Sequence, residues 1–197
     1  MKKRTVSWNE LQSLVSKICR DISLSGWEPD YIVGITRGGL LPAKMISHYF
    51  DVPMHALGVS LRDVNAEQGP ETNCWMSEDA FGYPKQEIEV EQDNIEGIFT
   101  AADELLSLTD NYKNILIVDD INDTGATFNW IINDWQSTCM PDDPSWEDVW
   151  NGNVKFAVMF DNLASECNAK MDFVGTEINK AEEDVWVDFP YEDWWTK

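Results

Sequence analysis

Apolar residues near the start of the chain recur at the spacing of one face of an α-helix. The positions with this spacing are Leu11, Leu14, Val15, Ile18 and Ile22. Ser7 precedes them and Glu10 stands three residues later, an arrangement typical of a capping box at a helix N-terminus. Gly26 and Pro29 follow the last apolar position and predict where the helix ends.

Short apolar runs rich in β-branched residues predict buried strands along the rest of the chain. These runs cover residues 31–35, 54–60, 114–118, 155–160 and 185–187. Helices are predicted at 40–50, 101–108 and 128–136. Strands that alternate with helices predict an α/β domain with a mostly parallel sheet. In such sheets ligands bind at the carboxyl ends of the strands, so the loops that follow the strands are the places to search for chemistry.

Two stretches break this alternation. Residues 61–97 and 137–153 are polar and acidic, and we predict irregular structure for both. Neither a repeat nor a Gly/Ser linker divides the chain, so residues 1–197 are expected to form a single domain.

The segment 115–127 carries the clearest chemistry. An apolar strand ends in Asp119 and Asp120, and a polar loop with Asp123 leads into the next helix. Backbone N–H groups at Thr124, Gly125, Ala126 and Thr127, together with the helix N-terminus, predict a cradle for a phosphate. The two adjacent carboxylates would repel a phosphate. They favour instead the vicinal hydroxyls of a sugar, or a Mg²⁺ ion held through water. The plain alternative is an acidic loop that only caps a helix.

A second loop follows the strand at 31–35. It reads Thr36, Arg37, Gly38 and Gly39, and a helix begins directly after it. The guanidinium of Arg37 and the free backbone N–H groups of this loop suit a diphosphate.

Both segments resemble signatures of the type I phosphoribosyltransferases. Segment 115–127 is similar to the family's signature for phosphoribosyl pyrophosphate (PRPP), and residues 33–43 are similar to its pyrophosphate loop. The resemblance implies an α/β fold, with a mostly parallel sheet flanked by helices and a small hood built from the termini. It also implies a cis peptide between Thr36 and Arg37.

Residues 5–11 and 186–192 look like the corresponding segments of the xanthine–guanine and hypoxanthine group of this family. Residues 63–110 and 137–153 lie outside the resemblance and are interpreted as insertions, the first of them at the place of the family's mobile catalytic lid. Residues 185–197 are expected to form the hood and the base-binding tail.

The family's functional residues transfer to this chain position by position. The resemblance implies that Asp123 is the catalytic acid or base, and that the PRPP-binding residues are Thr36, Arg37, Gly38, Gly39, Asp119, Asp120, Asp123, Thr124, Gly125, Ala126 and Thr127. Trp186 would stack on the base and the backbone of Val187 would read its edge, although Trp186 also fits a core role. Mg²⁺ is the implied cofactor, and its predicted ligands are Asp119, Asp120, Glu192 and Asp193.

One family residue is missing. Purine transferases place a lysine after the strand that corresponds to 155–160, where it contacts the exocyclic oxygen of the base, but this chain has Asn162 and Leu163 there. Asn162 could supply a neutral hydrogen bond in its place, and Lys170 could reach back from the following loop. The identity of the base therefore stays open at this point.

The charge restricts the partners. With 36 Asp and Glu against 14 Lys and Arg, the formal charge of the 197 residues is −22, so nucleic acid and anionic membranes are disfavoured. No apolar run reaches membrane-spanning length, and the N-terminus lacks the apolar stretch of a signal peptide. The four cysteines have neither zinc nor Cys-x-x-Cys spacing, which favours free thiols and a cytoplasmic location.

Three functions follow from these observations. The first is Mg²⁺-dependent transfer of ribose 5-phosphate from PRPP to a 6-oxopurine, which releases pyrophosphate and yields a nucleoside monophosphate, as in purine salvage. The second is the same transfer to another acceptor. The third is a PRPP-binding regulatory protein without turnover. A homodimer or homotetramer is expected by resemblance alone.

Overall fold

The structure of the protein, a computed structural model, describes residues 2–59, 74–82 and 112–195. Its helices and strands in chain order are β1 (Lys2–Thr5), α1 (Trp8–Ser25), β2 (Tyr31–Ile35), α2 (Leu40–Phe50), β3 (Met54–Leu57), α3 (Cys74–Phe81), β4 (Ile115–Asn122), α5 (Ala126–Thr138), α6 (Trp146–Asn151), β5 (Val154–Asn162), β6 (Phe173–Ile178) and β7 (Val185–Asp188). None of the described helices is both long and apolar enough to cross a membrane.

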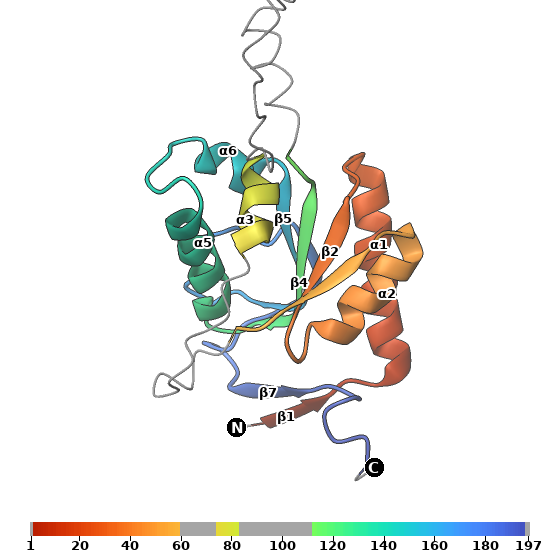
Figure 1. The fold of residues 1–197 in the computed structure, drawn as a ribbon. Helices are drawn as coiled ribbons and strands as arrows, with labels where there is room; N and C mark the ends of the chain where they lie inside the picture. Colours follow the sequence, from red (N-terminus) through yellow and green to blue (C-terminus); the bar gives the residue numbers. More distant parts are fainter. Residues whose placement is uncertain (1, 60–73, 83–111, 196–197) are drawn as a thin grey trace, which may run out of the picture.

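Five strands form the central sheet in the order β3-β2-β4-β5-β6, and every pair in it is parallel. Helices α1 and α2 cover one face, and α3, α5 and α6 cover the other (Figure 1). The predicted α/β class with a mostly parallel sheet is therefore confirmed. The sequence expectation for α1 also holds, because the Glu10 N–H donates to the Ser7 hydroxyl at 3.1 Å and Gly26 ends the helix at φ 73°.

Both faces of the sheet are buried, which explains why β4 begins as a continuous apolar run. Leu116 and Val118 belong to the core under α1 and α2, whereas Ile115 and Ile117 belong to the core on the opposite face. All four side chains are fully buried. A strand of this kind sits in the middle of the sheet, and its carboxyl end is consequently surrounded by the ends of its neighbours.

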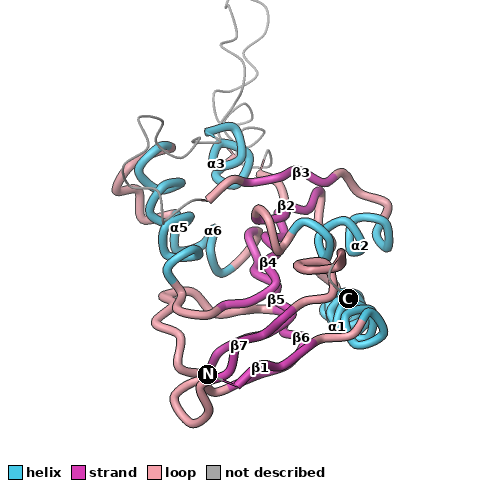
Figure 2. The backbone as a smooth tube through the Cα atoms, turned by 90° about the horizontal axis from the view of Figure 1, so that it is seen from below, coloured by secondary structure: helices cyan, strands magenta, loops and turns pink. Residues whose placement is uncertain are grey.

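The two ends of the chain meet in a second, two-stranded sheet. Strand β1 pairs in parallel with β7, and Lys2 stands opposite Val185. This ribbon lies beyond one end of the central sheet, and the C-terminal segment passes close to it (Figures 1 and 2). Val187 and Phe189 belong to the core under α1 and α2, so the ribbon is anchored to the main domain. We call β1, β7 and residues 189–195 the hood.

Both stretches predicted to be irregular contain a helix. In the first, α3 buries Met76, Ser77 and Ala80, a spacing of one and four residues. In the second, α6 buries Trp146 and Val149, and the Trp146 indole N–H donates to the Cys139 carbonyl at 3.0 Å. In the sequence, acidic neighbours obscure the helical spacing of these few apolar residues. The two helices are stabilised by tertiary packing. The predicted helix at 101–108, and the remainder of the 63–110 insertion outside 74–82, lie outside the described residues.

Three further differences concern strands. Strands β1 and β6 were not predicted, and the strand expected to end at residue 118 continues as β4 through the two acids to Asn122. The continuation is stabilised by β5, since Asp119 stands opposite Val158 and Asn122 opposite Asp161. The acids therefore lie on a strand and not in a loop.

Candidate active site

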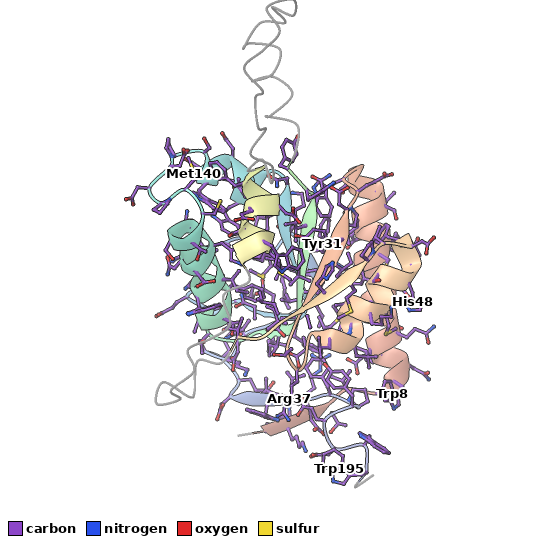
Figure 3. All side chains as sticks on the ribbon, viewed as in Figure 1. Trp8, Tyr31, Arg37, His48, Met140 and Trp195 are labelled. Carbon is purple, nitrogen blue, oxygen red and sulfur yellow. The ribbon has the colours of Figure 1, made fainter. Side chains whose placement is uncertain are left out.

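The predicted site residues gather at the carboxyl end of the central sheet. The loop after β2, the end of β4 and the end of β5 meet there because the three strands are parallel neighbours. Figure 3 shows Arg37 at the same end of the molecule as the hood, whereas Tyr31, at the start of β2, lies toward the other end. The hood thus stands over the place where ligands of parallel sheets bind.

Asp119 and Asp120 form the electrostatic centre of this region. Both carboxyl groups are only partly exposed, and the backbone N–H of Asp120 donates to Asp119 Oδ1 at 2.9 Å. Burial raises the pKa of Asp119 well above its ordinary value, and the neighbouring charge of Asp120 raises it further. Burial also raises the pKa of Asp120. Two crowded, poorly hydrated carboxylates favour partners that donate hydrogen bonds or carry positive charge.

The loop after β2 lies directly against these acids. The peptide bond between Thr36 and Arg37 is cis, as the resemblance implied. A Cβ atom on Gly38 would overlap the Asp120 carboxylate, and one on Gly39 would overlap the carbonyl oxygen of Val118. Only glycine permits this approach, so the two glycines bring the Arg37 loop and the acid pair into one site. Arg37 itself is exposed to solvent.

The loop predicted to bind a phosphate follows β4. Gly125 adopts φ +85°, and a Cβ there would overlap the backbone of Cys167. Helix α5 begins at Ala126 with Gly125 as its N-cap, and the Ala126 N–H donates to the Thr124 hydroxyl at 3.4 Å. The N-terminus of a helix is a place where anions bind. The loop after β5 supports this turn, because the Glu166 N–H donates to the Thr124 carbonyl at 3.1 Å. The turn is therefore held open toward solvent at Thr124 and Ala126, which are both exposed.

Asp123 is paired with a lysine that the sequence analysis did not identify. Lys180 Nζ lies 2.8 Å from Asp123 Oδ1, and 18% of the Lys180 side chain and 43% of the Asp123 side chain are exposed. Lys180 lies two residues beyond the carboxyl end of β6. Since β6 was not predicted, nothing in the sequence pattern placed its following loop at this edge of the sheet.

Asn162 makes contacts that the sequence analysis did not expect. Its Nδ2 donates to the Asp123 carbonyl at 2.7 Å, and its Oδ1 accepts from the N–H of Lys180 at 3.0 Å and of Ala164 at 3.2 Å. The residue is 6% exposed. The prediction that Asn162 contacts the base stays a prediction, although its amide is buried and bonded to backbone groups. The amide joins the backbone of Asp123 to that of Lys180.

The two hood residues predicted to bind the base differ in exposure. Trp186 is 42% exposed and belongs to neither core cluster, so a core role for it is excluded. The Val187 side chain is buried. The N–H groups of Lys2 and Val6 donate to the carbonyls of Asp184 and Asp188. The backbone N–H and C=O groups of the even-numbered residues of β7 therefore point toward β1. The backbone groups of Val187 consequently point to the opposite edge of the ribbon.

The predicted metal ligands Asp119, Asp120, Glu192 and Asp193 stay a prediction. No group of three or more His, Cys, Asp or Glu side chains suited to a metal occurs among the described residues. Glu192 Oε1 accepts from the Phe189 N–H at 3.3 Å within its own turn. Asp119 and Asp120 remain the oxygen donors that suit a hard divalent cation, and neutralisation by such a cation would offset their mutual repulsion.

The cis-peptide glycine loop, the acid pair and the turn that begins α5 all lie at the carboxyl end of a parallel sheet, where ligands of α/β proteins bind. The model of the phosphoribosyl transferase domain matches residues 7–193, and the chain belongs to this family.

Individual relatives are distant. Xanthine phosphoribosyltransferase 1 of Saccharomyces cerevisiae is 25% identical over 136 residues, which is 66% of this chain and 58% of the yeast protein. The purine phosphoribosyltransferase of Pyrococcus horikoshii has a TM-score of 0.57 at 20% identity, and the xanthine-guanine-hypoxanthine phosphoribosyltransferase of Helicobacter pylori 0.58 at 15%. Each structural match covers 98% of this chain and 96% of the other, which establishes a shared fold.

Proposed function

We propose that the protein transfers ribose 5-phosphate from PRPP to a 6-oxopurine and releases pyrophosphate. The observation that carries the proposal is the Lys180–Asp123 ion pair, which joins the loop after β4 to the loop after β6. It presents one cation and one carboxylate within 2.8 Å of each other, a pairing that suits the exocyclic oxygen and the neighbouring ring nitrogen of a 6-oxopurine. Family membership and the curated xanthine transferase relative support the same reaction class.

In this proposal the phosphates of PRPP lie on two backbone cradles. The 5′-phosphate binds at residues 124–127, where α5 begins and where Thr124 and Ala126 are exposed. The diphosphate binds at residues 36–39, where the exposed guanidinium of Arg37 can grip two of its oxygens. These local donors offset the formal charge of −22, which would otherwise repel an anionic substrate.

The acid pair lies between these cradles and suits the ribose. As pyrophosphate leaves C1, positive charge develops on the ribose ring, and the Asp119 and Asp120 carboxylates stabilise that charge and accept hydrogen bonds from the hydroxyls. The same two residues would hold Mg²⁺, directly or through water. Bound there, Mg²⁺ would neutralise charge on the diphosphate.

The base lies under the hood. The Trp186 ring stacks on it, and the backbone groups of Val187 meet its edge; a stack of this type contributes roughly 1–3 kcal/mol. Lys180 donates to the exocyclic oxygen, and Asp123 takes up or returns the proton at the adjacent ring nitrogen. A second nitrogen of the base forms the new bond to C1 while the bond to pyrophosphate breaks.

The test is pyrophosphate release from PRPP and Mg²⁺ with hypoxanthine, guanine, xanthine, adenine, uracil and orotate supplied singly. We expect release with at least one 6-oxopurine and none with adenine, uracil or orotate. Release only with a base that lacks the 6-oxo group would refute the purine assignment. PRPP binding without release for any base would favour the regulatory alternative.

A further inference from the structure

Tyr191 connects the hood to the acid pair. Its hydroxyl donates to Asp120 Oδ2 at 3.3 Å across 71 residues of sequence. Tyr191 follows β7, the strand that carries Trp186, whereas Asp120 lies on β4 of the central sheet. The bond therefore spans the two parts of the molecule that the proposed reaction requires to act together.

Packing holds the Tyr191 ring in place independently of this bond. The ring stacks on Phe189 at a centroid distance of 5.4 Å and an interplanar angle of 14°. Phe189 in turn meets Phe160 of β5 edge to face at 5.6 Å. A phenol anchored in this way donates from a fixed position, because the aromatic contacts have already restricted its rotation.

The Arg37 loop also restricts the position of the Asp120 carboxylate, from another side than Tyr191. Gly38 lies so close that a Cβ atom there would overlap the carboxylate. Gly38 limits where the carboxylate can move, and the Tyr191 hydroxyl fixes one of its oxygens. The orientation of Asp120 thus depends on a loop that suits the diphosphate and on a residue of the hood.

We propose that Tyr191 is a positioning residue for ribose binding: its hydroxyl orients Asp120 toward the ribose hydroxyls of PRPP. The inference rests on the proposed function. Tyr191 does not contact the reacting atoms in this scheme; it acts through Asp120. Loss of the hydroxyl releases the carboxylate and weakens the grip on PRPP, while the aromatic ring continues to support the hood.

The experiment is Tyr191→Phe, which removes one oxygen and keeps the ring, with Tyr49→Phe on the exposed side of α2 as the matched control. PRPP binding is measured by calorimetry with Mg²⁺ and no base, and initial rates are measured with PRPP and base varied separately. We expect Kd and KM for PRPP to rise roughly threefold to tenfold, which is less than the loss of a direct hydrogen bond to a charged group would give, because Tyr191 acts on PRPP only through Asp120. The KM for the base should stay unchanged, and Tyr49→Phe should match the wild type.

A purely structural role for Tyr191 predicts a different split. It would lower the melting temperature and weaken base binding together with PRPP binding, because Trp186 would move with the hood. A double-mutant cycle tests whether Tyr191 acts through Asp120: the effect of Tyr191→Phe on PRPP affinity should vanish in an Asp120→Ala background, where the hydroxyl has no acceptor. Unchanged PRPP affinity, or an effect that persists in that background, overturns the inference. A wild-type protein that does not bind PRPP refutes the proposed function, and this inference with it.

Discussion

Replacing Lys180 by methionine tests the proposed base recognition directly. The substitution keeps an unbranched side chain of similar length and removes every hydrogen-bond donor from its end. In the structure it leaves Asp123 without the partner that lies 2.8 Å away. Because Asp123 is 43% exposed, water can replace that partner, and we expect the free energy of unfolding to fall by less than about 1 kcal/mol.

The effect on catalysis should be much larger. A hydrogen bond from a charged donor contributes about 1.5–3 kcal/mol. If Lys180 holds the exocyclic oxygen in the transition state, kcat/KM for a 6-oxopurine falls roughly 10-fold to 150-fold. PRPP affinity should stay near the wild-type value, because Lys180 contacts neither phosphate cradle in this scheme. The assay is pyrophosphate release at varied base, with PRPP binding measured separately by calorimetry.

Lys170→Met is the matched control, because Lys170 is exposed on the connection between β5 and β6. It should behave as the wild type. A kcat/KM for Lys180→Met within about twofold of the wild type would refute the reasoning. Loss with Lys170→Met instead would assign base recognition to Lys170. Equal losses for base and PRPP would show that Lys180 only orients Asp123.

Three further outcomes are expected. Asp123→Asn should reduce turnover at least about tenfold, or about 1.4 kcal/mol of barrier, while calorimetry still detects PRPP binding; an unchanged rate would remove Asp123 from the chemistry. Trp186→Ala should raise the KM for the base with little change in PRPP affinity, and equal losses of both would contradict a stacking role. Burial raises the pKa of Cys19 from 9.0 to about 11, so the folded state favours the neutral thiol. Its contribution to stability is complete below pH 9 and is lost as the pH rises toward 11, by about 2–3 kcal/mol. Denaturant unfolding should therefore show the stability advantage of wild type over Cys19→Ala shrink by that amount across this range, and a constant difference would contradict it.

The parts of the fold that could be predicted from the sequence are those with local causes. Helix α1 and strands β2 and β4 follow from apolar periodicity within a few residues of each position. Strand β1 was missed because it has no apolar residue and forms by pairing with β7. Helices α3 and α6 and strand β6 were missed, since their apolar residues are few and interrupted by polar ones. These elements form because neighbouring parts of the fold bury them, as Met76 and Trp146 are buried.

The residues of the candidate site also fall into those that a local sequence pattern predicts and those that tertiary packing brings in. Asp119, Asp120, Gly38 and Gly39 lie in two short contiguous segments at strand ends, so the sequence by itself determined that an acid pair and a glycine loop would meet at one edge of a parallel sheet. The polar contacts around them join residues far apart in the chain. Asn162 reaches Asp123 across 39 residues, and Tyr191 reaches Asp120 across 71.

Only the tertiary structure decided which side chains complete the site. Lys180 contacts Asp123 because β6 lies beside β5 and directs its following loop to the same edge, and Tyr191 contacts Asp120 because β7 pairs with β1 over the carboxyl end of the sheet. Strand order and the path of the chain ends set these distances, and neither is encoded in a local pattern. A short-range signal therefore predicted the residues proposed to bind phosphate and ribose, whereas the proposed base recognition and the orientation of Asp120 depend on how distant segments pack.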